Sequence, residues 1–420
     1  MQRLIIKGKK KLRGKIKISG SKNATLPILA ASILSTSSEI KNIPLVNDIF
    51  TMVKLLKFIG LKCSLSKKNK TIKIFNKLTR SNKNIIAPYK LVKTMRAGVL
   101  VLGPILNKCG KAKVSLPGGC AIGTRPVDLH LMALKKLGAK IKIKNGYIHA
   151  TALKGLKGAN IKFPFISVGA TENAILAAFG AEGKTILNNC AIEPEIKDLV
   201  NYLNKLGGKI NIKKRKITIH GVKETRKISY KVMFDRIELG TYLISAGTAG
   251  NKISFSNVDK KVINTEIKIL KKIGVKVICK KNKITAIGND KLKKVSIKTG
   301  PYPGFPTDLQ AQIMVLMTQS EGTSKITETI FENRFMHVPE LKRMGANIFI
   351  KNNHAYIKGP TKLSGAEVMA TDLRASVSLV LAALLAENRT IINRIYHLDR
   401  GYQHLEKKLN NCRANIKRIN

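Results

Sequence analysis

The chain has 420 residues, enough for two or three domains, and its 78 basic and 24 acidic side chains give a formal net charge of +54. Its apolar share of 44% is that of a globular protein with a core. The longest apolar run, residues 375–385, is shorter than the ~20 residues of a membrane span. Residues 1–17 are basic but lack the apolar stretch of a secretory signal. We therefore expect a cytoplasmic protein with no membrane partner.

The charge by itself would indicate a nucleic-acid binder without enzymatic activity. Lysine, isoleucine and asparagine are, however, enriched along the whole chain, and no stripe of interleaved basic and aromatic residues stands out. This uniform enrichment indicates a compositional bias, so we expect no nucleic-acid partner. The charge should still raise the local concentration of anionic ligands.

In chain order, one fragment recurs six times: the end of an amphipathic helix, a glycine, and an alternating strand. The glycine position holds Gly60, Gly138, Gly207, Gly274, Gly345 and, in the sixth copy, Arg413. A glycine after a helix is typical of a left-handed C-cap, and the alternation is typical of a strand. Successive copies lie 67 to 78 residues apart, so six repeated supersecondary units account for the whole chain.

Upstream of each copy, a short strand leads into a polar cluster that begins an apolar helix. The clusters are residues 21–23, 93–96, 167–173, 235–241, 306–308 and 371–374. One unit therefore reads strand, helix, strand, helix, strand, and the fold class is α/β. Helix N-termini carry unpaired N–H groups and a partial positive charge that suit phosphates and carboxylates. Each cluster taken alone could instead be a simple cap.

Residues 116–130 combine a thiol, Cys120, with three glycines between Pro117 and Pro126. Such a run favours a mobile active-site loop with a reactive thiol, and the alternative is a surface loop with a free thiol. The segment from Arg125 to Leu129 could hold a sugar nucleotide. The six cysteines form no C-x-x-C pair and the seven histidines no H-x-x-x-H pair, so we predict no metal site and no cofactor.

Several charged residues begin helices or stand in polar clusters. Lys22 and Asn23 suit an anion at a helix start, and Arg96 at the start of a buried helix needs an anionic partner. Asp308 begins a helix after a proline-rich segment and is either a general base or a simple N-terminal acid. Three further clusters carry arginine and suit a substrate with several negative charges; they contain Arg334 with His337, Asp372 with Arg374, and Asp399 with Arg400. We expect Asp235, Arg236 and Glu238 to form a structural ion-pair network.

A resemblance to one family rests on seven motifs. In chain order they are SGSKNATLPILAA, PYKLVKTMRA, SLPGGCAIGTRPVDLH, FPTDLQAQ, TETIFENRFMHVPEL, MATDLRAS and RIYHLDRGY. Together they resemble the UDP-N-acetylglucosamine enolpyruvyl transferase family, from end to end of the chain. The resemblance implies two inside-out α/β barrel domains of three units each. It places residues 21–227 in one domain and residues 1–20 with 228–420 in the other.

The resemblance also implies roles. Cys120 resembles a general acid that protonates C3 of phosphoenolpyruvate, forms a covalent adduct and is alkylated by fosfomycin, while Asp308 resembles the base for the sugar hydroxyl. Lys22, Arg125 and Arg400 resemble contacts to phosphoenolpyruvate, and Asp372 and Arg334 match further active-site positions. The implied contacts to UDP-N-acetylglucosamine are Asn23, Arg96, Arg125, Pro126, Val127, Asp128, Leu129, Ser167, Val168, Gly169 and Ile330. Many members of the family carry a polar or basic residue at the position where this chain has Phe165.

The implied reaction is transfer of the enolpyruvyl group to the sugar 3-hydroxyl, which opens peptidoglycan synthesis. The alternative is the sister enzyme that acts on shikimate 3-phosphate. The PGGC and RPVD segments argue against that alternative. The oligomeric state is not predicted by the sequence.

Overall fold

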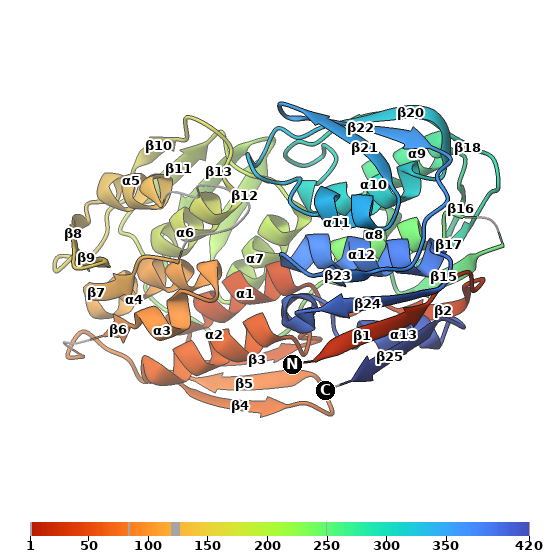
Figure 1. The fold of residues 1–420 in the computed structure, drawn as a ribbon. Coiled ribbons are helices and arrows are strands. Elements are labelled where there is room, and N and C mark those ends of the chain that lie inside the picture. Colours follow the sequence, from red (N-terminus) through yellow and green to blue (C-terminus); the bar gives the residue numbers. More distant parts are fainter. Residues whose placement is uncertain (1, 83–84, 119–126, 249, 420) are drawn as a thin grey trace. The chain divides into compact units, whose positions relative to one another are not determined.

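The computed structural model describes residues 2–82, 85–118, 127–248 and 250–419 (Figure 1). They divide into two compact units. The first unit contains the described residues between 20 and 233, and the second contains residues 2–19 together with those from 234 onward. The compact units divide after Met233, whereas the resemblance implied a crossing near Lys227, and β14 (Ile228–Lys231) pairs in parallel with β3 (Ser37–Lys41) of the first unit.

Among the described residues, each unit contains three sheets of one design. A short edge strand runs parallel to its neighbour, and the other strand pairs are antiparallel. In the first unit the sheets are β14-β3-β5-β4, β6-β7-β9-β8 and β10-β11-β13-β12. The remaining strands of these sheets are β4 (Lys62–Ser66), β5 (Thr71–Phe75), β6 (Ile86–Ala87), β7 (Lys111–Ser115), β8 (Lys140–Lys144), β9 (Tyr147–Thr151), β10 (Asn160–Lys162), β11 (Lys184–Asn188), β12 (Lys209–Lys213) and β13 (Lys216–His220).

The second unit repeats this design with the N-terminal strands included. Its sheets are β16-β17-β15-β2, β18-β20-β22-β21 with β19 beside β20, and β23-β24-β1-β25. Their strands are β1 (Arg3–Lys7), β2 (Arg13–Lys17), β15 (Lys252–Ser256), β16 (Lys276–Lys280), β17 (Lys283–Ile287), β18 (Leu292–Lys293), β19 (Ser296–Lys298), β20 (Ser320–Thr327), β21 (Asn347–Lys351), β22 (His354–Gly359), β23 (Glu367–Met369), β24 (Arg389–Asn393) and β25 (Asn415–Ile419). The N-terminal β1 thus lies between β24 and β25 and completes the sixth repeat.

The first helix of each repeat is buried along almost its whole length. In the first unit these helices are α1 (Lys22–Ala31), α4 (Leu102–Cys109) with η2 (Arg96–Val101) before it, and α6 (Val168–Ala178). In the second unit they are α8 (Arg236–Ser245), α10 (Gln310–Met317) after η4 (Thr307–Leu309), and α12 (Leu373–Leu385). Figure 1 shows the sheets on the outside of each unit, with these helices between them. Each unit has its own apolar core, and this arrangement confirms the predicted α/β fold of repeated units.

The second helix of each repeat has one buried and one exposed face. These helices are α2 (Asn47–Phe58), α5 (Asp128–Lys136), α7 (Pro194–Lys205), α9 (Asn264–Ile273), α11 (Val338–Arg343) and α13 (Leu405–Asn410). Shorter helical segments are η1 (Ser32–Leu34), α3 (Tyr89–Val92), η3 (Lys260–Ile263) and η5 (Ile395–Arg400). Among the described residues, no helix combines the length and apolar character needed to cross a membrane.

The chain turns left-handed after these helices, as the repeat pattern predicts. The backbone φ angle is 94° at Gly138 and 73° at Arg413. The N–H of each donates to a helix carbonyl three residues earlier at 2.9 Å. Arg413 therefore takes the same cap conformation as the glycines, although its Cβ makes this conformation costly.

Candidate active site

In the second unit, Asp308 lies in the first turn of η4, where Pro306 begins the helix. Arg334 Nη2 donates to Asp308 Oδ1 at 2.9 Å, and Arg374 Nε donates to Asp308 Oδ2 at 3.3 Å. The arginine side chains are 4% and 5% exposed, whereas that of Asp308 is 29% exposed. Two buried cations thus hold a carboxylate that a ligand can still reach.

Arg374 is the second residue of α12, which begins at Leu373 after its N-cap, Asp372. Asp372 Oδ1 accepts hydrogen bonds from the backbone N–H groups of Arg374 at 2.7 Å and Ala375 at 3.0 Å. The Arg374 guanidinium lies 5.4 Å from the centre of the Tyr402 ring. Burial lowers the pKa of Arg374, but Tyr402 and the carboxylates of Asp308 and Asp235 together raise it by more. The pKa of Arg374 is therefore above its usual value, and the guanidinium stays charged.

His337 and Arg400 lie near the same helix start. Burial lowers the pKa of His337 to about 4, with Arg334 lowering it and Asp372 raising it. His337 is therefore neutral at pH 7. Arg400 is the last residue of η5 and is half-buried. Burial lowers the pKa of His397, and the positive charge of Arg400 lowers it as well. Arg400 thus adds positive charge on η5.

Two of the three residues expected in a structural ion-pair network, Arg236 and Glu238, form ion pairs in this unit, each with a residue outside that set. Arg236 Nη1 lies 3.6 Å from Glu266 Oε1, and Lys408 Nζ lies 2.5 Å from Glu238 Oε1. Asp235 caps α8 by accepting from the backbone N–H groups at positions 237 and 238. Asp399, by contrast, is held by Arg418 at 2.8 and 3.0 Å and plays a structural part on η5.

In the first unit, Lys22 begins α1 after the N-cap Ser21. Lys22 Nζ lies 3.3 Å from Asp48 Oδ2 of α2, and both side chains are largely buried. Asn23 follows in the same turn and is half-buried. Asp48 gives no signal in the sequence, because only the packing of α1 against α2 brings it to Lys22.

Arg96 begins η2, which contacts both α1 and α6. Burial, followed by the charge of Arg96, lowers the pKa of His130 to about 3. The His130 ring also lies against α6, because a Cβ built on Gly169 would stand 3.1 Å from its Cε1 atom. Ser167 caps α6 and accepts from the Ala170 N–H at 3.3 Å. The starts of η2 and α6 thus both lie close to His130.

Three further predicted residues of this unit lie at the start of α5. Val127 and Leu129 are buried, whereas Asp128 is exposed. Phe165 and Val168, near the start of α6, are 56% and 38% exposed. Cys120, Arg125 and Pro126 lie outside the described residues.

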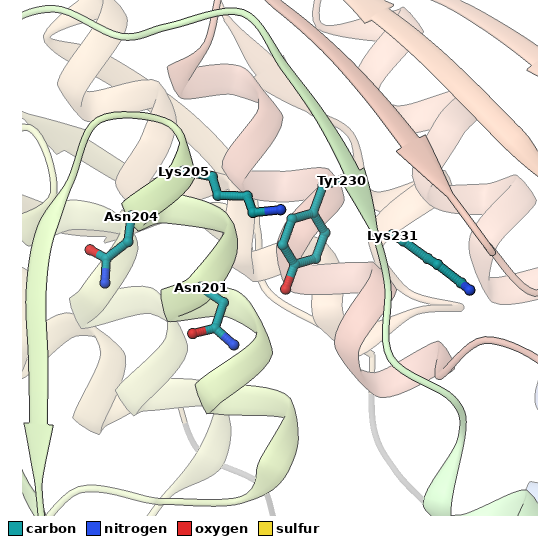
Figure 2. Close-up of a pocket in the computed structure, with 5 residues that line it drawn as sticks. All are labelled: Asn201, Asn204, Lys205, Tyr230 and Lys231. Atoms are coloured by element: carbon teal, nitrogen blue, oxygen red, sulfur yellow. The ribbon is translucent and has the colours of Figure 1, made fainter. Parts of the chain in front are cut away.

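This unit also has a surface pocket (Figure 2). It is lined by Asn201, Asn204, Lys205, Tyr230 and Lys231, from α7 and β14. The Lys205 ammonium lies 5.5 Å from the centre of the Tyr230 ring, and the Asn204 amide donates to the backbone carbonyl of Ile210 in β12 and accepts from its N–H, each at 2.9 Å. None of the predicted site residues lines this pocket. Within the described part of the chain, no cluster of three metal-ligating side chains occurs either.

The comparisons identify the class of protein. The family model of EPSP synthase (3-phosphoshikimate 1-carboxyvinyltransferase) matches residues 6–409, so the chain belongs to this enolpyruvyl transferase family. The fold agrees with solved enolpyruvyl transferases. NikO from Streptomyces tendae has a TM-score of 0.88 at 23% identity, and the match covers 100% of this chain and 99% of NikO. An EPSP synthase from Acinetobacter baumannii has a TM-score of 0.79 at 18% identity, with 100% of each chain covered.

Closer relatives narrow the group within the family. A protein of Pelagibacter ubique (strain HTCC1062) is 59% identical, and one of Rickettsia canadensis (strain McKiel) is 53% identical, each over 100% of both chains. Both are named UDP-N-acetylglucosamine 1-carboxyvinyltransferase. The resemblance stated from the seven motifs is therefore confirmed.

Proposed function

We propose that this chain transfers the enolpyruvyl group of phosphoenolpyruvate to the 3-hydroxyl of UDP-N-acetylglucosamine and releases phosphate. The observation that carries the proposal is full-length identity of 59% to a relative with this name. We further propose that the reaction is the first committed step of peptidoglycan synthesis and runs in the cytoplasm. Reducing conditions there keep thiols free.

In the proposed mechanism, addition is followed by elimination. The sugar 3-hydroxyl loses its proton to Asp308 and its oxygen bonds to C2 of phosphoenolpyruvate, while Cys120 gives a proton to C3. One C3 proton then returns to the Cys120 thiolate and the double bond re-forms as the C2–O bond to phosphate breaks, while the departing phosphate takes up the proton held by Asp308. The enol ether and phosphate are the products, and the protons balance.

The contacts of Asp308 support its role as the base. Each carboxylate oxygen accepts a hydrogen bond from an arginine, and these two bonds fix the carboxylate in orientation. Its partial exposure allows a hydroxyl to reach it. A base acts in this way only when it lies within hydrogen-bond distance of the proton that it removes.

The charged helix starts support the binding of two anionic substrates. We propose that Lys22, Arg125 and Arg400 contact phosphoenolpyruvate, and that Asp372, Arg334 and Arg374 complete its surroundings. For the sugar nucleotide we propose Asn23, Arg96, residues 125–129, residues 167–169 and Ile330, with exposed Phe165 beside them. Helix N-termini and arginine forks suit the phosphate and carboxylate groups of both substrates.

Phosphate release tests the proposal and separates it from the sister activity. Purified protein is given phosphoenolpyruvate alone, with UDP-N-acetylglucosamine, or with shikimate 3-phosphate. We expect rapid phosphate release with UDP-N-acetylglucosamine only. Release with shikimate 3-phosphate instead would assign the sister reaction, and no release with either acceptor would reject both.

A further inference from the structure

Glu328 is a buried carboxylate to which no role has yet been given. It follows β20 directly and is 3% exposed. Its backbone is fixed to Asn353: the Glu328 N–H donates to the Asn353 carbonyl at 2.9 Å, and Asn353 Nδ2 donates to the Glu328 carbonyl at 3.0 Å. The backbone at Glu328 is therefore held by the turn between β21 and β22.

The carboxylate of Glu328 accepts four hydrogen bonds. Oε1 accepts from the backbone N–H of Ile330 at 2.8 Å, that of Phe331 at 3.3 Å and Thr299 Oγ1 at 2.9 Å. Oε2 accepts from Thr307 Oγ1 at 2.8 Å. Hydrogen bonds to an ionised acceptor are roughly twice as strong as neutral ones, so this side chain is a strong link between the segments that it joins.

The two segments joined are those that the proposed reaction uses. Thr307 directly precedes Asp308, the proposed base, and Ile330 is a proposed contact to the sugar nucleotide. One carboxylate thus fixes the start of η4 relative to residues 330–331. A substrate held at Ile330 would meet the base at a distance that depends on this link.

We propose that Glu328 is a positioning residue that sets Asp308 against the sugar hydroxyl. This inference rests on the proposed function. It assigns Glu328 no contact with the reacting atoms: the residue acts through Thr307 on one side and the 330–331 backbone on the other. Misplacement of a reacting group by about 1 Å can cost roughly 100-fold in rate, so loss of the link should lower kcat.

Two substitutions of Glu328 test the proposal. Glu328→Met fills similar space but accepts no hydrogen bond, and we expect kcat to fall at least ~10-fold and KM for UDP-N-acetylglucosamine to rise. Glu328→Gln keeps an acceptor for the 330–331 backbone, and its amide can donate to the Thr307 hydroxyl, so this variant should restore most of kcat. Kinetic constants are referred to the folded fraction, determined by circular dichroism.

A second variant covers the case in which Glu328→Met does not fold. Thr307→Val breaks only the link toward Asp308, so kcat should fall while KM for UDP-N-acetylglucosamine stays near the wild-type value. Thr329→Val is the matched control. It removes the hydrogen bond that the Thr329 hydroxyl donates to the Thr299 carbonyl at 2.7 Å, and it leaves the contacts of Glu328 in place. Its kcat should not change.

Two outcomes would overturn the positioning role. One is a folded Glu328→Met variant with the kcat and KM of the wild type. The other is an equal loss of kcat in Thr307→Val and Thr329→Val. These outcomes require an active wild-type protein. Absence of wild-type turnover would instead count against the proposed function itself.

Discussion

Asp308 and Arg334 are 26 residues apart in the chain, yet their side chains meet at 2.9 Å. The arginine is buried and the carboxylate is partly exposed. Leaving one member of such a pair without its partner is costly, so the exposed carboxylate keeps one orientation in the folded unit. In our account this orientation is what makes Asp308 a base.

Replacing Arg334 by lysine keeps the charge but removes the planar fork that fixes Asp308 Oδ1. We expect kcat to fall ~10-fold or more, because the base is no longer held in place. Steady-state phosphate release measures the effect. Arg343→Lys is the control. The Arg343 side chain is 62% exposed, and its ion pair with Glu340 is long, at 3.9 Å. The kcat of this variant should therefore stay near the wild-type value.

Cys120→Ala should abolish turnover at neutral pH while UDP-N-acetylglucosamine still binds, because the general acid is lost. Fosfomycin, an epoxide, should inactivate the wild-type protein by alkylating this thiol. The test is mass spectrometry of the treated protein, together with calorimetry of sugar-nucleotide binding to the variant. Full activity in Cys120→Ala would remove the cysteine from the mechanism.

Alkylation should be selective, since burial raises the pKa of Cys63 to about 11, of Cys412 to about 11 and of Cys190 to about 12. Thiols of this kind are scarcely ionised at pH 7.5, and the thiolate is the reactive form. Iodoacetamide should therefore label Cys120 first in a Cys279→Ser background. Fast labelling that persists after the further change Cys120→Ala would contradict this.

Glu172→Gln should stabilise the first unit at neutral pH. Burial, with added repulsion from Glu195 and Glu193, raises the pKa of Glu172 well above its usual value near 4.5. Above pH 4.5 the unfolded chain releases a proton that the folded protein keeps, so wild-type stability falls as pH rises, by up to about 1.4 kcal/mol per pH unit. Urea unfolding at pH 5, 6.5 and 8 should show the variant's advantage growing with pH.

The exposed Glu182 gives the control for this pH series. Glu182→Gln changes the same chemical group without burial, so its stability should follow that of wild type at each pH. An advantage of Glu172→Gln that is constant or shrinks with rising pH would contradict the account.

Gly138→Ala should lower the free energy of unfolding by about 1 kcal/mol. The φ angle of Gly138 is 94°, and a Cβ there would meet nothing within 4 Å, so the cost comes from backbone strain alone. Gly300 also has open space for a Cβ but no left-handed φ. Gly300→Ala should be neutral or slightly stabilising by the same urea measurement.

The repeat design could be predicted from the sequence because it rests on local signals. A helix end, a left-handed residue and an alternating strand recur at a nearly fixed interval, and the structure has this cap even at Arg413, where the glycine is missing. The pairing of β14 with β3 joins segments about 190 residues apart, so the local patterns behind the crossing expected near Lys227 carried no sign of it.

The partners of the site residues could not be predicted in the same way. Asp308, Lys22 and Arg96 were predicted from capping patterns, and each stands at a helix start. Asp48 and Glu328 were missed because their contacts depend on how helices and strands pack, and a lone carboxylate in a sequence carries no sign of its partner. Within each unit, these contacts come from long-range packing rather than from local pattern.

The most direct test of the account is the kcat of Asp308→Asn at saturating phosphoenolpyruvate and UDP-N-acetylglucosamine, with the affinity for the sugar nucleotide measured alongside. The amide keeps the shape of the side chain but cannot take the hydroxyl proton. The account predicts a loss of kcat of roughly 100-fold or more, with the sugar nucleotide still bound. A variant that retains most of the wild-type kcat would contradict the role of Asp308 as the base.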